Sequence, residues 1–174
     1  MFAYITGAPF VFMNLYGVRP ERFGWLIALN AFAVVGSAQV NGRVFHGHGP
    51  EKLMRNAALV QCLAGVLLVA AAMVGVSHLA GVGLPLWMYL ASVGFVFPNA
   101  VALAMAHHGK NAGMASALLG TIQFSMAAVA TIIMGAVNSV TAMPMAVIIG
   151  ACGAMGVATH MVLLGSGPRA AESL

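Results

Sequence analysis

Charged residues are scarce in this chain of 174 residues: they make up 6% of it, whereas 61% of the chain is hydrophobic. Soluble domains carry about 25% charged residues on average, and a body this small has too much surface to cover with so few. Acidic residues are the scarcest, since only Glu21, Glu51 and Glu172 are present. These shortages exclude an ordinary water-soluble domain and indicate that the main solvent is lipid.

The sequence also lacks the features of several functional classes. The seven basic residues give a net charge of +4, but they lie at the ends of apolar runs and not on one basic face, so we expect no nucleic-acid partner. Cys62 and Cys152 lie inside apolar runs, where a thiol behaves as a small hydrophobic group, and we expect no disulfide. The histidines lack further ligands at usable spacing, so no metal is expected.

Catalytic motifs are absent as well. The chain has no glycine loop for phosphate, no nucleophile elbow and no metal-binding helix motif, so we expect neither an enzyme nor a cofactor. No charged residue lies in the middle of an apolar run, although proton-coupled carriers typically hold an ionisable relay at membrane depth. Any such relay must therefore come from outside this chain.

Six apolar runs appear when the sequence is read with a window of about 20 residues. They lie near 1–16, 23–42, 56–76, 86–106, 113–137 and 144–164. Five are long enough to cross a hydrocarbon core of about 30 Å, whereas the first supplies about 24 Å and is expected to be cut at its N-terminus. No basic segment precedes it, so it is not a signal peptide. We predict an all-α membrane protein with six transmembrane helices in one domain, 1–174.

The basic residues predict the orientation of these helices. The connectors 17–22, 77–85 and 138–143 hold Arg19 and Arg22 alone. The connectors on the other side hold five basic residues: Arg43, Lys52, Arg55, Lys110 and Arg169. Because cytoplasmic loops carry the excess of lysine and arginine, we expect the second set, and with it both termini, to be cytoplasmic.

Prolines mark the expected helix starts. Pro20 with Glu21 and Pro50 with Glu51 suit a first helical turn, where proline gives up an amide that has no partner and a carboxylate faces the positive end of the dipole. Pro85 is expected to open the fourth helix in the same way, and Pro144 can open the sixth.

Amides inside the apolar runs are the most informative polar residues. They are Asn30, Gln39, Gln61, Asn99 and Gln123. An amide facing lipid is costly unless it is hydrogen-bonded, so each should face either another helix or a wet cavity. Asn99 is the strongest functional candidate because it follows Pro98, whose missing amide kinks the helix.

Small residues recur every four positions in the fifth run. The stripe consists of Ala112, Ser116 and Gly120, beside Gly113 and Ala117. Small residues let two membrane helices approach closely. The stripe suits a static bundle contact or helices that rock against each other, and spacing does not separate the two.

Several stretches resemble the Bcr/CflA drug-resistance transporters, a branch of the major facilitator superfamily. The segment 4–12 (YITGAPFVF) is similar to the opening of that family's second half. The segments 97–104 (FPNAVALA) and 108–120 (HGKNAGMASALLG), continuing to Gln123 and Phe124, resemble its tenth and eleventh helices and the loop between them. Segments 41–43 (NGR) and 49–52 (GPEK) resemble a degenerate copy of the superfamily's basic loop.

The resemblance implies a C-terminal six-helix half of a twelve-helix, proton-driven exporter of drugs and other small amphipathic compounds in a bacterial inner membrane. An N-terminal six-helix half is then the expected partner. By position in the family, the residues that could contact substrate are Tyr4, Phe10, Asn30, Asn99 and Gln123. The residues of cytoplasmic loops that latch the closed state would be Arg43, Lys52 and Lys110. The residues of close helix contacts would be Gly113, Ser116, Ala117 and Gly120.

Two other interpretations stay open at this point. The family's coupling carboxylate and strongest motifs lie in the N-terminal half, which this chain lacks. The chain could therefore be a truncated remnant or structural membrane protein without transport activity. Alternatively, two copies could form a homodimeric half-sized carrier, for which we would expect facilitated diffusion.

Overall fold

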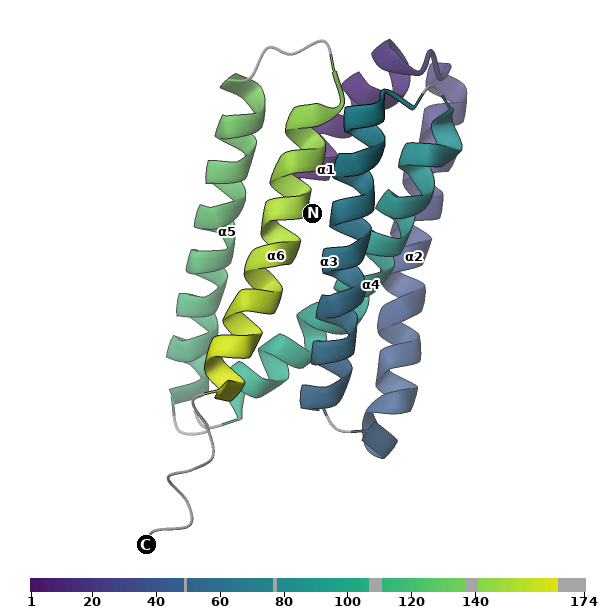
Figure 1. Ribbon diagram of the computed structural model, residues 1–174. Helices are drawn as coiled ribbons and strands as arrows, with labels where there is room; N and C mark the ends of the chain where they lie inside the picture. Colours follow the sequence, from purple (N-terminus) through teal and green to yellow (C-terminus); the bar gives the residue numbers. More distant parts are fainter. Residues whose placement is uncertain (49, 77, 107–110, 137–140, 166–174) are drawn as a thin grey trace, which may run out of the picture.

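The fold is a bundle of helices that lie side by side (Figure 1). The computed structural model describes residues 1–48, 50–76, 78–106, 111–136 and 141–165. In chain order its elements are α1 (Phe2–Pro9), the π-helix η1 (Phe10–Leu15), α2 (Pro20–His48), α3 (Pro50–Val74), α4 (Leu79–Met105), α5 (Ala112–Ala136) and α6 (Met143–Gly165). The part of the chain that the structure describes contains no strand, which confirms the all-α prediction.

Among the residues that the structure describes, five helices are long and apolar enough to cross a membrane. Within α2 to α6 the apolar segments run over Pro20–Val44, Glu51–Val74, Leu79–Met105, Ala112–Ala136 and Met143–Val162. The first helical segment, Phe2–Leu15, is apolar but shorter. The prediction of five full-length spans and one short one is confirmed, and the chain is a multi-pass membrane protein.

Three of the four expected helix starts are confirmed. α2 begins at Pro20, α3 begins at Pro50, and Pro144 is the second residue of α6. The fourth expectation was wrong, because α4 begins at Leu79 and holds Pro85 inside the helix. Burial explains the extra turns: Val82, Pro85 and Leu86 are all buried, and this packing compensates for the backbone hydrogen bond that proline cannot make.

The core lies between α1, η1, α3, α4 and α6. Its largest fully buried apolar side chains are Val11, Phe12, Leu68, Val82, Leu86, Leu90, Met145 and Ile149. By contrast, α5 contains no buried residue. Its contact with α1 includes an edge-to-face packing of the Phe2 and Phe124 rings, whose centroids are 6.2 Å apart. α5 is therefore the spanning helix that the rest of the described chain covers least, and it forms the uncovered side of the bundle.

Glycines permit close helix approaches at two points. A Cβ on Gly94 of α4 would collide with Ser37 Oγ and the Val34 carbonyl of α2. A Cβ on Gly65 of α3 would lie 3.0 Å from the Gly150 Cα of α6. These two crossings join α2 to α4 and α3 to α6, and only a residue without a side chain fits at either point.

Candidate functional site

Tyr4 and Asn30 join α1 to α2 inside the bundle. The Asn30 Nδ2 donates a hydrogen bond of 2.9 Å to the Tyr4 hydroxyl, and both residues are buried. The two helices thus satisfy a polar pair that neither could bury alone in lipid. The Tyr4 hydroxyl keeps its own proton to donate.

Asn41 and Asn99 form a second polar pair, which joins α2 to α4. The Asn99 Nδ2 donates one hydrogen bond of 2.7 Å to Asn41 Oδ1 and another of 2.7 Å to the Phe95 carbonyl. Asn99 is 1% exposed and Asn41 is 4% exposed. Both donor positions of the Asn99 amide are therefore occupied.

The Asn99 Oδ1 is a buried acceptor without a partner among the described residues. It lies directly after Pro98, which is inside α4 and cannot donate to the Gly94 carbonyl one turn earlier. Figure 1 shows α4 bending toward the foot of α5 in its last turns, in agreement with the predicted kink. A buried, unpaired acceptor beside a kink can bind a donor group of a small molecule, since an unpaired acceptor is costly.

The two pairs are separate points on one face of α2. Asn30 and Asn41 are eleven residues apart, which is close to three helical turns, or about 16 Å. The sequence pattern assigns Asn41 only to a loop motif. Its spacing of eleven residues from Asn30 could have shown that the two amides lie on the same face of α2. The structure therefore brings two predicted substrate residues, Tyr4 and Asn30, together. It pairs the third, Asn99, with Asn41, which was not predicted as a substrate residue.

The other predicted substrate residues lie elsewhere. Phe10 is half-buried and packs against the core. Gln123 is exposed on α5 and is not joined to either pair. Gln39 is also exposed, whereas Gln61 is half-buried and interacts with the Tyr89 hydroxyl of α4. The expectation that each amide faces either another helix or a wet cavity is thus met within this chain by Asn30, Gln61 and Asn99, whereas Gln39 and Gln123 are exposed.

The predicted loop and packing residues are at the surface of this chain. Arg43 and Lys52 are exposed, and Lys110 lies outside the described residues. Gly113, Ser116 and Ala117 are exposed and Gly120 is half-buried, while a Cβ on either glycine would meet nothing within 4 Å. The small-residue stripe therefore forms no close helix contact within the described chain, and its role in packing remains a prediction about another partner.

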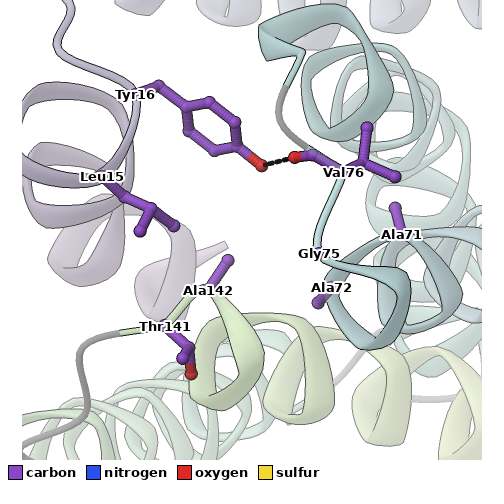
Figure 2. A pocket seen from close by; sticks show the side chains of 8 residues that line it. All are labelled: Leu15, Tyr16, Ala71, Ala72, Gly75, Val76, Thr141 and Ala142. Atoms are coloured by element: carbon purple, nitrogen blue, oxygen red, sulfur yellow. Dashed lines mark hydrogen bonds between the residues drawn. The ribbon is translucent and has the colours of Figure 1, made fainter.

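A cavity of about 310 Å³ lies near the end of the bundle where η1 stops (Figure 2). Its lining includes Leu15, Ala72 and Ala142. The Tyr16 hydroxyl donates a hydrogen bond of 2.8 Å to the Val76 carbonyl beside it. None of the residues of the two polar pairs lines this cavity, so the cavity is separate from the candidate site.

Metal ligands do not gather in the described part of the chain, where no group of three or more His, Cys, Asp or Glu side chains could hold an ion. His160 on α6 is buried, and its Nε2 has no partner among the described residues. Hydrogen bonding by neutral side chains is therefore the chemistry that the described site offers.

Two curated proteins are similar to this chain. The uncharacterized MFS-type transporter YdgK of Bacillus subtilis (strain 168) is 34% identical over 129 residues, which are 74% of this chain and 32% of that protein. The bicyclomycin resistance protein homolog of Haemophilus influenzae (strain ATCC 51907 / DSM 11121 / KW20 / Rd) is 26% identical over 136 residues, with the same shares. The chain thus spans about a third of the length of the curated relatives it matches. No family model and no solved structure matches it.

Proposed function

We propose that this multi-pass, all-α membrane protein of the major facilitator superfamily type is the C-terminal half of a twelve-helix secondary transporter of the Bcr/CflA branch. In this proposal residues 1–174 form one six-helix domain, and an N-terminal six-helix half is its partner. The complete transporter exports small amphipathic compounds, such as antibiotics, from the cytoplasm. The resemblance of segments 97–104 and 108–120 to that branch supports the assignment.

The observation that carries the proposal is that two buried polar contacts lie among uncharged side chains inside the bundle. The Asn30–Tyr4 contact joins α2 to α1, and the Asn41–Asn99 contact joins α2 to α4. The two contacts lie about three turns apart along α2. Amides and phenols recognise many amphipathic molecules, because they donate and accept hydrogen bonds without requiring a charge. Tyr4, Phe10, Asn30, Asn99 and Gln123 are the residues that we assign to substrate contact.

The uncovered side of the bundle supports a partner half. α5 buries none of its residues within this chain, and its stripe of Gly113, Ser116, Ala117 and Gly120 has the small residues of a close helix contact. We assign this stripe to packing in the complete transporter. In such transporters two halves rock around a site near the middle of the membrane.

The distribution of charged residues supports our assignment of the coupling and of the orientation. No carboxylate that could carry a proton lies in the middle of any of the six apolar runs of this sequence, so we assign proton coupling to the partner half. Arg43, Lys52 and Lys110 latch the cytoplasmic side of the closed state. The protein lies in the inner membrane with both termini in the cytoplasm, because the richer set of basic residues is on that side.

Complementation tests this function. The chain is coexpressed with a matching N-terminal half, and the efflux of a fluorescent amphipathic compound is measured with and without an uncoupler. We expect efflux from the pair only, and we expect the uncoupler to abolish it. Asn99→Ala in the pair should lower efflux, whereas Gln39→Ala, at an exposed amide, serves as the matched control. Efflux from the pair that never exceeds that of either half alone would exclude the proposal.

A further inference from the structure

A cavity of about 560 Å³ lies where η1 passes into α2. Arg19 and Arg22 line it, together with Trp25 and Leu29 further along α2 and Leu79 at the start of α4. Neither buried polar pair lines this cavity. It therefore needs an explanation apart from the proposed transport site.

The two arginines supply positive charge that nothing in the described chain neutralises. Both are exposed, and neither side chain forms an ion pair or a hydrogen bond with any described residue. The one carboxylate close to them in sequence, Glu21, directly precedes Arg22 on the helix, and adjacent helical residues do not face each other. His78 precedes α4 at the same end of the bundle. Two guanidinium groups without a partner among the described residues thus line the cavity.

An apolar track runs from these arginines into the membrane. Trp25, Leu29 and Phe32 share the outer face of α2 because they are four and three residues apart, and they are 78%, 52% and 70% exposed. From Arg22 to Phe32 the helix rises about 15 Å, which is about half of a hydrocarbon core. Tryptophan is also enriched at the membrane interface. The arginines match the charged headgroup of a lipid in one leaflet, and the apolar side chains that follow them match its acyl chain.

We propose that this cavity binds an anionic phospholipid. The guanidinium groups of Arg19 and Arg22 hold the headgroup phosphate, because a guanidinium donates paired hydrogen bonds to phosphate oxygens. An acyl chain lies along Trp25, Leu29 and Phe32. The site is at the end of the bundle opposite to Arg43 and Lys52, so it is distinct from the basic loops that the transport proposal uses.

Lipid-specific quenching of Trp25 tests this site in the 174-residue chain. The sequence has two tryptophans, so Trp87→Phe leaves Trp25 as the sole reporter. The protein is reconstituted in bilayers that contain brominated phosphatidylglycerol or brominated phosphatidylcholine, and quenching gives the relative association of each lipid. We expect a preference for phosphatidylglycerol of about fivefold for each arginine. Arg19→Gln with Arg22→Gln should bring the ratio to about one, whereas Arg43→Gln with Lys52→Gln at the other end should leave it unchanged.

Four outcomes would overturn the proposal. Equal quenching by the two lipids, or a preference that survives Arg19→Gln with Arg22→Gln, would show that these arginines bind no lipid phosphate. Loss of the preference in inorganic phosphate, but not in chloride of equal ionic strength, would assign the site to a soluble anion. Absence of quenching by either lipid would show that another protein surface covers Trp25. None of these measurements depends on transport, so the transport proposal can fail or succeed separately.

Discussion

The side-chain amide of Asn99 reaches 2.7 Å from the Oδ1 of Asn41, a residue 58 positions earlier in the chain, and so connects α4 to α2. The contact lies just beyond Gly94, where α2 and α4 approach too closely for a side chain. Pro98 lies between Gly94 and Asn99, so the kink, the close crossing and the hydrogen bond all lie within six residues of α4. The Asn41–Asn99 pair thus joins α2 to α4 directly beside the proline kink.

We expect Asn99→Ala to lower efflux by about fivefold in the complemented transporter, since one hydrogen bond contributes about 1 kcal/mol. Gln61→Ala should lower it less, because Gln61 lies on α3 and is half-buried outside both pairs. The rate of efflux of a fluorescent substrate from loaded cells gives both values. Equal transport by the two variants would remove Asn99 from the substrate site.

The Asn41–Asn99 contact should also contribute to stability. We expect a coupling free energy of about 0.6 kcal/mol and at most about 1.7 kcal/mol, the range found for hydrogen bonds between membrane helices. Unfolding of the wild-type chain, Asn41→Ala, Asn99→Ala and the double variant in detergent completes the double-mutant cycle. Additive effects of the two single substitutions would contradict the contact.

Tyr4→Phe should destabilise the chain by about 1 kcal/mol, because the buried Asn30 amide loses its acceptor. The ring itself still fills the same space. Gln123→Ala is the control, since this side chain is exposed and its removal should leave the thermal midpoint nearly unchanged. A Tyr4→Phe variant as stable as the wild-type chain would show that Asn30 finds another acceptor.

Gly94→Ala should destabilise the chain by about 1–3 kcal/mol, the usual cost of forcing extra atoms into packed helices. Elsewhere in a helix the same substitution is favourable by up to about 1 kcal/mol. Gly156→Ala is therefore a matched control, since a Cβ there meets nothing within 4 Å. Thermal unfolding of both variants in the same detergent compares them directly. A Gly94→Ala variant with raised stability would contradict the close crossing of α2 and α4.

Much of the fold could be predicted because apolar length and proline position are local properties. The five spans follow from runs of about 20 apolar residues, and Pro20 and Pro50 mark helix starts without reference to the rest of the chain. Pro85 was misread because burial against neighbouring helices, which a local pattern does not contain, extends α4 to Leu79.

The candidate site could be predicted only in part, because pairing depends on how the helices cross. Asn30 and Asn99 stand out as amides in apolar runs, but the acceptor opposite each one belongs to another helix. Close approaches are equally hard to place, since glycine spacing in α5 resembles a packing stripe while the observed crossings use Gly94, Gly65 and Gly150.

Gly120→Leu should separate folding of this chain from assembly with its partner half. In the chain alone a side chain at Gly120 meets nothing within 4 Å, so the thermal midpoint should change little. In the complemented transporter the same side chain would separate two closely packed helices, and we expect co-purification of the tagged halves and efflux to fall together.

Gly113→Leu tests the same stripe two turns earlier, and Gly83→Leu, on α4 with open space around it, is the matched control. If both halves still co-purify with Gly120→Leu and Gly113→Leu, the partner does not pack on this stripe, because the substitutions would have filled the space that its helix needs.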